Sequence, residues 1–152
     1  MTQPNHLWHR LLASEAPRAI ALIRLAVGSI FLSEGIKKFL FAESLGVGRF
    51  KSIGIPAPEV MAPFVGSVEI VCGVLVILGL VTRLAAVPLV IIMLVAIATT
   101  KVPILFAHGF WKMAHDARTD FAMLSGAACL VLIGAGPLSV DDWLVRRGKG
   151  RH

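Results

Sequence analysis

The sequence has few cysteines and few charged residues, and both shortages limit what the protein can be. Its two cysteines, Cys72 and Cys129, form no CxxC motif, which excludes a thioredoxin-type redox motif, and they provide no disulfide framework. Charged residues make up 16% of the chain and hydrophobic residues 57%. Soluble domains usually contain about 25% charged residues, so this composition favours an integral membrane protein over a soluble helical one.

Four long apolar stretches account for this composition. A helix needs about 20 mostly apolar residues to cross the hydrocarbon core of a bilayer. We predict membrane spans over Ala19–Leu40, Met61–Val81, Leu84–Thr100 and Phe121–Leu138. The expected fold is all-α, an integral membrane four-helix bundle with up-down antiparallel topology.

The regions outside the spans divide the chain into three parts. Residues 1–17 are predicted to be an interfacial segment, because the run HLWHRLLASEAPRAI suits a short amphipathic helix on the membrane surface with Trp8 at headgroup level. They are not predicted to be a cleavable signal, since no small-x-small cleavage site follows the first apolar stretch. Residues 18–144 form the four-helix domain, and residues 145–152 form a basic C-terminal tail.

Turn-forming residues predict how the spans are connected. The PAPE run at residues 56–59 should open the second span, since proline suits the first turn of a helix. Thr82 and Arg83 should form a tight turn, residues 101–120 a loop, and the GAGP run at residues 134–137 the end of the fourth span.

The basic residues indicate contact with lipid rather than nucleic acid. The net charge is +6, but the basic residues lie at span ends and in tails, where they face anionic headgroups. Lys and Arg divide equally between the two sides of the membrane, seven on each, so the positive-inside rule does not decide the orientation. The dense RRGKGR tail and the acidic residues on the opposite side favour cytoplasmic termini.

Charged residues within the spans are the best candidates for function, since each costs about 2.5–3.5 kcal/mol or more at the bilayer centre. Glu69 lies roughly 12 Å inside the second span. It therefore needs a cation such as Lys38, protonation, or a polar cavity. Arg24 lies toward the opposite surface, where Asp141 or Asp142 would neutralise it, and we interpret Arg24 with Asp141 as a structural ion pair.

The alternating direction of the spans places a group of ionisable residues in one half of the bilayer. We predict a ligand-binding site formed by Glu34, Lys38, Glu69 and Asp120, with Glu69 and His108 as catalytic candidates. His108 and His115, two ligands in one loop, are too few to predict a metal site.

Several motifs resemble those of DoxX-like membrane proteins. The first span carries the pattern of Arg24, Gly28, Phe31, Gly35 and Lys38. The others are GIPAP before the second span, Glu69 within it, GLVTRLAA at its end, the HGFW stretch, and GAGPLSVD closing the fourth span. The similarity covers about residues 18–144, although Asp120 stands where many relatives carry Glu.

The resemblance implies a bacterial inner-membrane four-helix bundle associated with membrane redox systems. Such systems include the small subunits of thiosulfate:quinone oxidoreductase and thiol- or sulfur-linked oxidoreductase complexes. In this hypothesis the protein binds a quinone headgroup, Glu69 and His108 exchange protons, and Lys38 stabilises an anionic oxygen.

A partner redox protein would then supply the electrons, because the sequence has no flavin or nucleotide fingerprint and no haem-type histidine pair. The alternative is a non-catalytic scaffold, or a carrier that binds a lipid or small solute, either of which is compatible with a homo-oligomer. Four short spans without a repeat argue against an autonomous transporter.

Overall fold

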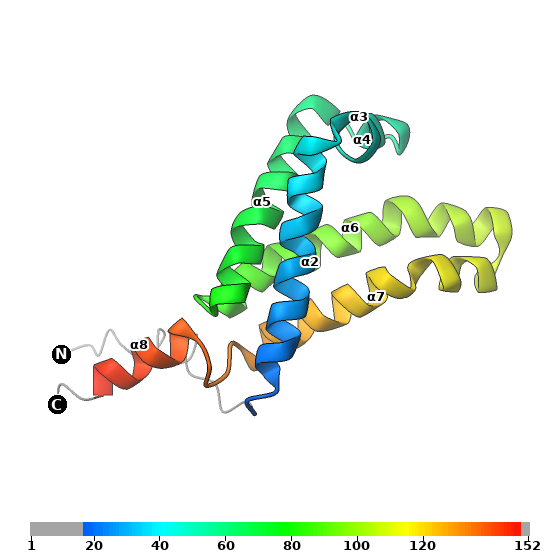
Figure 1. Ribbon diagram of the computed structural model, residues 1–152. Coiled ribbons are helices and arrows are strands. Elements are labelled where there is room, and N and C mark those ends of the chain that lie inside the picture. Colours follow the sequence, from blue (N-terminus) through cyan, green and yellow to red (C-terminus); the bar gives the residue numbers. More distant parts are fainter. Residues whose placement is uncertain (1–16, 150–152) are drawn as a thin grey trace, which may run out of the picture.

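The computed structural model describes residues 17–149, which form helices joined by short connections (Figure 1). The long helices are α2 (Ile20–Leu40), α5 (Pro58–Leu78), α6 (Thr82–His108) and α7 (Phe110–Ile133). The short ones are α3 (Ala42–Leu45), α4 (Val47–Ser52) and α8 (Val140–Lys149). The all-α prediction is confirmed for these residues, whereas the predicted interfacial segment, apart from residue 17, lies outside them.

Proline and glycine set the boundaries of α5. Pro58 stands at the first turn of the helix, directly after Ala57 in a left-handed conformation with φ of 47°, so the prediction from the PAPE run is confirmed. Gly79 ends α5 with a φ of 70°, and its N–H donates to the last carbonyl groups of the helix. The turn into α6 therefore comes slightly earlier than predicted, and Thr82 already begins the next helix.

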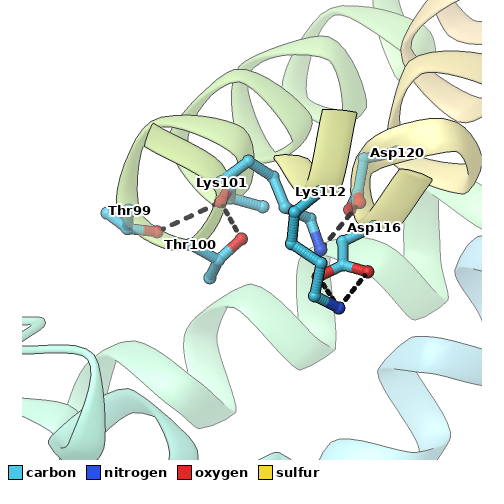
Figure 2. A network of polar contacts seen from close by, with 7 residues as sticks. Thr99, Thr100, Lys101, Lys112, Asp116 and Asp120 are labelled. Atoms are coloured by element: carbon cyan, nitrogen blue, oxygen red, sulfur yellow. Dashed lines mark hydrogen bonds and ion pairs between the residues drawn. The ribbon is translucent and has the colours of Figure 1, made fainter. Parts of the chain in front are cut away.

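The loop predicted over residues 101–120 is wrong, because α6 and α7 continue through this region. α6 accommodates Pro103 and runs to His108, and α7 starts after Gly109, whose φ is 82°. In this region Lys101 of α6 pairs with Asp120 of α7, and Lys112 pairs with Asp116 within α7 (Figure 2). A single glycine thus makes the whole connection.

The long helices form two pairs, α2 with α5 and α6 with α7. Glycines allow α2 and α5 to approach closely: a Cβ atom on Gly28 would lie 2.8 Å from the carbonyl oxygen of Gly73. A Cβ atom on Gly35 would lie 2.7 Å from the carbonyl oxygen of Gly66. Close backbone approach at small residues is the usual basis of helix association in membranes.

The two pairs contact each other mainly through α5 and α6, and they lean apart toward the end that carries α3 and α4 (Figure 1). Their shared core includes Phe31, Val76, Leu89 and Leu130, all 0–2% exposed. A regular four-helix bundle is therefore not confirmed. The structure has two helix pairs that diverge from a common core.

Two helices, α5 and α6, are long and apolar enough to cross a membrane. The other two long helices are of similar length but each contains four charged residues. The structure supports two of the four predicted spans by length and composition. At the other end of the chain, the boundary predicted after residue 144 falls inside α8.

Candidate functional site

A cavity of about 270 Å³ lies between the two helix pairs, and from here on it is referred to as the cavity. Five helices, α2, α4, α5, α6 and α7, contribute to its wall. Its apolar lining consists of Ile30, Phe31, Ile92, Met93, Ala96 and Met123, and its polar lining of Glu34, Lys38, Arg49, Glu69, Thr119 and Asp120. The four residues predicted to bind a ligand, which come from three separate segments, all line this one cavity.

Lys38 and Glu69 form an ion pair in the cavity wall. Lys38 Nζ lies 2.6 Å from Glu69 Oε2, and Glu69 is only 3% exposed. Of the options that the sequence left open for Glu69, pairing with Lys38 is therefore the one observed. The approach of α2 and α5 at Gly35 makes it possible, because a Cβ atom on Gly35 would lie 3.0 Å from the Cβ of Glu69.

A second acid from α2, Glu34, also has a lysine partner. Lys37 Nζ donates to Glu34 Oε1, so Glu34 pairs with Lys37, one helical turn away, and not with Lys38. Both side chains of this pair are more than a third exposed. Glu34 therefore lies at a solvent-accessible part of the cavity, whereas Glu69 lies deep inside it.

The α6–α7 pair contributes its own ion pair, which Figure 2 shows from close by. Lys101 Nζ lies 3.1 Å from Asp120 Oδ2, and both side chains are mostly buried. Asp116, one helical turn before Asp120, pairs with Lys112, whose Nζ lies 2.9 Å from Asp116 Oδ2. The hydrogen bond from Lys112 holds the pKa of Asp116 below its usual range. Figure 2 also shows Thr99 and Thr100, whose hydroxyl groups donate to backbone carbonyl groups of α6.

His108 does not join the other predicted residues. It is the last residue of α6, it is exposed, and it is not part of the cavity lining. Figure 1 shows the α6–α7 turn at the far tip of that pair, away from α2 and α5. The expectation that His108 works with Glu69 rested on their placement in the same half of the bilayer, and the continuous α6 puts His108 at its last residue, outside the cavity lining.

The lining includes residues that sequence reasoning missed. Arg49 comes from the short helix α4, and Thr119 precedes Asp120 on α7. Lys101, the partner of Asp120, was missed as well. Its distance along the chain from Asp120 fits no local spacing rule, so only the packing of α6 against α7 reveals the pair.

The opposite end of the molecule carries a second polar cluster, called the junction, formed by Arg24, Gly79 and Asp141. Arg24 is 4% exposed, and within residues 17–149 its hydrogen bonds all go to backbone carbonyl groups. Its guanidinium bonds the oxygen of Ala135 at 2.7 Å, that of Leu138, and that of Ile77 at 3.3 Å. It thereby ties α2 to the end of α5 and to the connection between α7 and α8.

Asp141 is the second charged residue of the junction, and it is 1% exposed. It accepts hydrogen bonds from the N–H groups of Val81 at 2.7 Å and Thr82 at 3.1 Å, and so caps α6. Its own N–H donates to Gly79 at 2.9 Å. Burial raises the pKa of Asp141, while the bonds from Thr82 and Val81 and the charge of Arg24 act in the opposite direction.

The sequence correctly placed Arg24 and Asp141 at the same end of the molecule, but the direct ion pair expected between them is absent from residues 17–149. The reason is that backbone groups already satisfy both side chains. Ser139 completes this region, since its hydroxyl accepts the N–H of Asp142 at 3.1 Å in the first turn of α8. Over the described residues, no cluster of three or more His, Cys, Asp or Glu side chains is arranged to hold a metal ion.

Residues 19–109 match the family described as DoxX. The chain is 52% identical over 146 residues to an uncharacterized membrane protein of Mycobacterium tuberculosis, covering 92% of this chain and 90% of that protein. It is 31% identical over 128 residues to CatD of Bacillus subtilis, whose name describes it as a candidate oxidoreductase, covering 84% and 88% of the two chains. No solved structure matches the chain.

Proposed function

Because the chain belongs to the DoxX family of membrane proteins, we propose that it is a small subunit of a membrane redox system. The name of the Bacillus subtilis relative supports a redox role. In this proposal the cavity binds the polar headgroup of a quinone, and a partner redox protein supplies electrons, directly or from a thiol- or sulfur-linked donor.

The size and lining of the cavity support a single-ring ligand. Ligand pockets usually measure about 300–1,000 Å³, so a cavity of about 270 Å³ suits one ring and not a dinucleotide. Phe31 and Met93 offer an apolar wall for such a ring, and Lys38 offers a donor for a carbonyl oxygen. These residues fit a quinone headgroup.

The ion pair of Lys38 and Glu69 is the observation that carries the proposal. Reduction of a quinone to a quinol takes up two electrons and two protons. Glu69 is the group that delivers or accepts a proton at the ligand oxygen, since a carboxylate within hydrogen-bond reach acts as a general acid or base. Lys38 stabilises negative charge that develops on that oxygen. A pair that served only to hold helices together would not need to line a cavity.

The proposed location is the bacterial inner membrane, with several spans and with both termini in the cytoplasm. In this arrangement the α6–α7 turn faces the periplasm. A cytoplasmic reporter fused after residue 152 should be active, and so should a periplasmic reporter inserted at residue 109. Activity of the opposite reporter at both positions would reverse the orientation.

The test of the proposal is a pair of variants in lipid nanodiscs. Glu69→Gln keeps the shape of the side chain but removes its charge, so it should fold normally and lose binding of a short-chain quinone. Glu59→Gln, an exposed acid in the first turn of α5, is the matched control and should bind as the wild type does. Calorimetric titration measures the binding, and the melting temperature reports the fold.

The double variant Glu69→Gln with Lys38→Met separates this proposal from a scaffold role. If the pair only ties α2 to α5, Glu69→Gln should destabilise the protein, because Lys38 loses its counter-ion. The double variant should then regain stability, since a buried pair replaced together often costs little. Restored stability with unchanged binding in the double variant would refute the site and leave a scaffold.

A further inference from the structure

When the lysines that pair with its carboxylates are counted, the cavity has one positive charge that is unpaired among the described residues, that of Arg49. Each of the three carboxylates in the lining has a lysine partner: Glu34 with Lys37, Glu69 with Lys38, and Asp120 with Lys101. Arg49 also lines the cavity, but no carboxylate of residues 17–149 pairs with it. One positive charge therefore faces the cavity without a counter-ion from the described part of the chain.

The backbone of Arg49 is held in place by the packing of α4. Gly46, immediately before this helix, is buried, and a Cβ atom there would collide with the carbonyl oxygen of Lys38 at the end of α2. The carbonyl of Arg49 itself accepts the N–H of Ile53 at 3.1 Å and the hydroxyl of Ser52 at 2.8 Å. The guanidinium thus projects from a fixed backbone while the side chain stays exposed.

We propose that Arg49 binds an anionic group of the ligand, so that the cavity takes a ring compound carrying one acidic substituent. This proposal rests on the proposed function, in which the cavity is a ligand site. A guanidinium binds carboxylate, sulfonate or phosphate oxygens through two parallel N–H bonds, which a neutral carbonyl cannot match. The ring itself lies against the apolar wall, and its acidic group neutralises the charge of Arg49, the cation that has no carboxylate partner in the described part of the chain.

The experiment compares an anionic and a neutral probe of the same ring. Protein in nanodiscs of phosphatidylcholine is titrated with 1,4-naphthoquinone-2-sulfonate and with 1,4-naphthoquinone. The ratio of their two dissociation constants is compared between variants, so that partition of the neutral probe into lipid cancels. Arg49→Gln should reduce the relative affinity for the sulfonate by on the order of tenfold, the effect of losing one hydrogen bond to a charged group.

Lys51→Gln is the matched control, because Lys51 is an exposed cation on the same short helix that does not line the cavity. It should leave the ratio unchanged. Arg49→Lys, which keeps the charge but not the paired donors, should retain part of the preference. Equal melting temperatures of all variants show that the fold is intact, as expected for an exposed side chain.

The outcomes separate this inference from the function on which it rests. If both probes bind and Arg49→Gln leaves their ratio unchanged, the acidic substituent is refuted and the quinone site stands. If the wild type binds neither probe, both proposals fail.

The same titration in phosphatidylglycerol nanodiscs identifies the source of the anion. If the wild type loses its sulfonate preference in this lipid and the Arg49→Gln variant shows no such change, the result supports the anion site at Arg49. It also assigns the natural occupant of that site to a lipid headgroup. A preference that persists supports a soluble acidic ligand.

Discussion

The junction and the cavity both hold charged side chains among apolar helices, but they satisfy them differently. At the junction, Arg24 and Asp141 bond to backbone carbonyl and N–H groups. At the cavity, lysines bond to carboxylates. Backbone partners are fixed by the ends of helices, whereas paired side chains can change partners or exchange a proton with a ligand. The junction is therefore suited to stabilising the fold, and the cavity is suited to binding a ligand.

The largest effect that this comparison predicts is at Arg24. Arg24→Leu should lower the free energy of unfolding by about 3 kcal/mol or more, because hydrogen bonds to a charged group contribute about 1.5–3 kcal/mol each. The carbonyl groups of Ala135 and Leu138 would lose their donor in a buried place. Thermal unfolding in mild detergent measures the change.

The control for this prediction is Arg18→Leu, since Arg18 is exposed just before α2. It should unfold as the wild type does. The protein that remains folded after Arg24→Leu should still bind the quinone probe. Normal stability together with lost binding would show that Arg24 acts in ligand binding and not in holding the fold, which would contradict the comparison.

A smaller loss of stability is expected at Asp141. Asp141→Ala removes the acceptor for the first N–H groups of α6, and the loss of a helix cap costs about 1–2 kcal/mol. The adjacent Asp142→Ala should cost less, because Asp142 pairs with the exposed Arg146 at 2.8 Å. Chemical unfolding of the two variants in detergent compares them directly, and equal losses would contradict a cap from Asp141.

The smallest effect is predicted for Lys112 and Asp116, a side-chain pair outside the cavity. The hydrogen bond from Lys112 lowers the pKa of Asp116. Its contribution to stability is therefore present above the unfolded pKa of about 4 and is lost as the pH falls through the lower folded value.

Asp116→Asn should remove this part of the dependence of stability on acidic pH. At neutral pH it should cause only a slight loss of stability, and high salt should make that loss smaller still. Unfolding midpoints measured across the acid range check it. A large loss at neutral pH would show that side-chain pairs hold this fold as firmly as the junction does.

Much of the fold and part of the site could be predicted from the sequence. Long apolar stretches, Pro58 and Gly134 located the long helices. The depth of Glu69 in its span called for a cation, protonation or a polar cavity, and the structure pairs it with Lys38 in a cavity wall. These inferences succeeded because each depends on the local sequence or on the cost of a buried charge.

The missed features depend on packing between distant segments. Nothing near Lys101 in the sequence indicates Asp120, and nothing in residues 42–59 indicates that Arg49 lies over the cavity. The direct ion pair expected between Arg24 and Asp141 is absent from residues 17–149 for a related reason, although the charge of Arg24 still acts on Asp141. Counting charges cannot show that backbone groups at helix ends bond to both residues first.

The hydrogen bonds of Arg24 also have a consequence for the order of synthesis. The ribosome makes this arginine before its partners, because two of the carbonyl groups that bind it follow 111 and 114 residues later. Asp141 likewise reaches the start of α6 across 59 residues. Until that last segment emerges, the guanidinium and the first turn of α6 lack these partners. A nascent chain therefore gains this set of bonds only after Asp141 has been made, and a chain that stops before that residue lacks them.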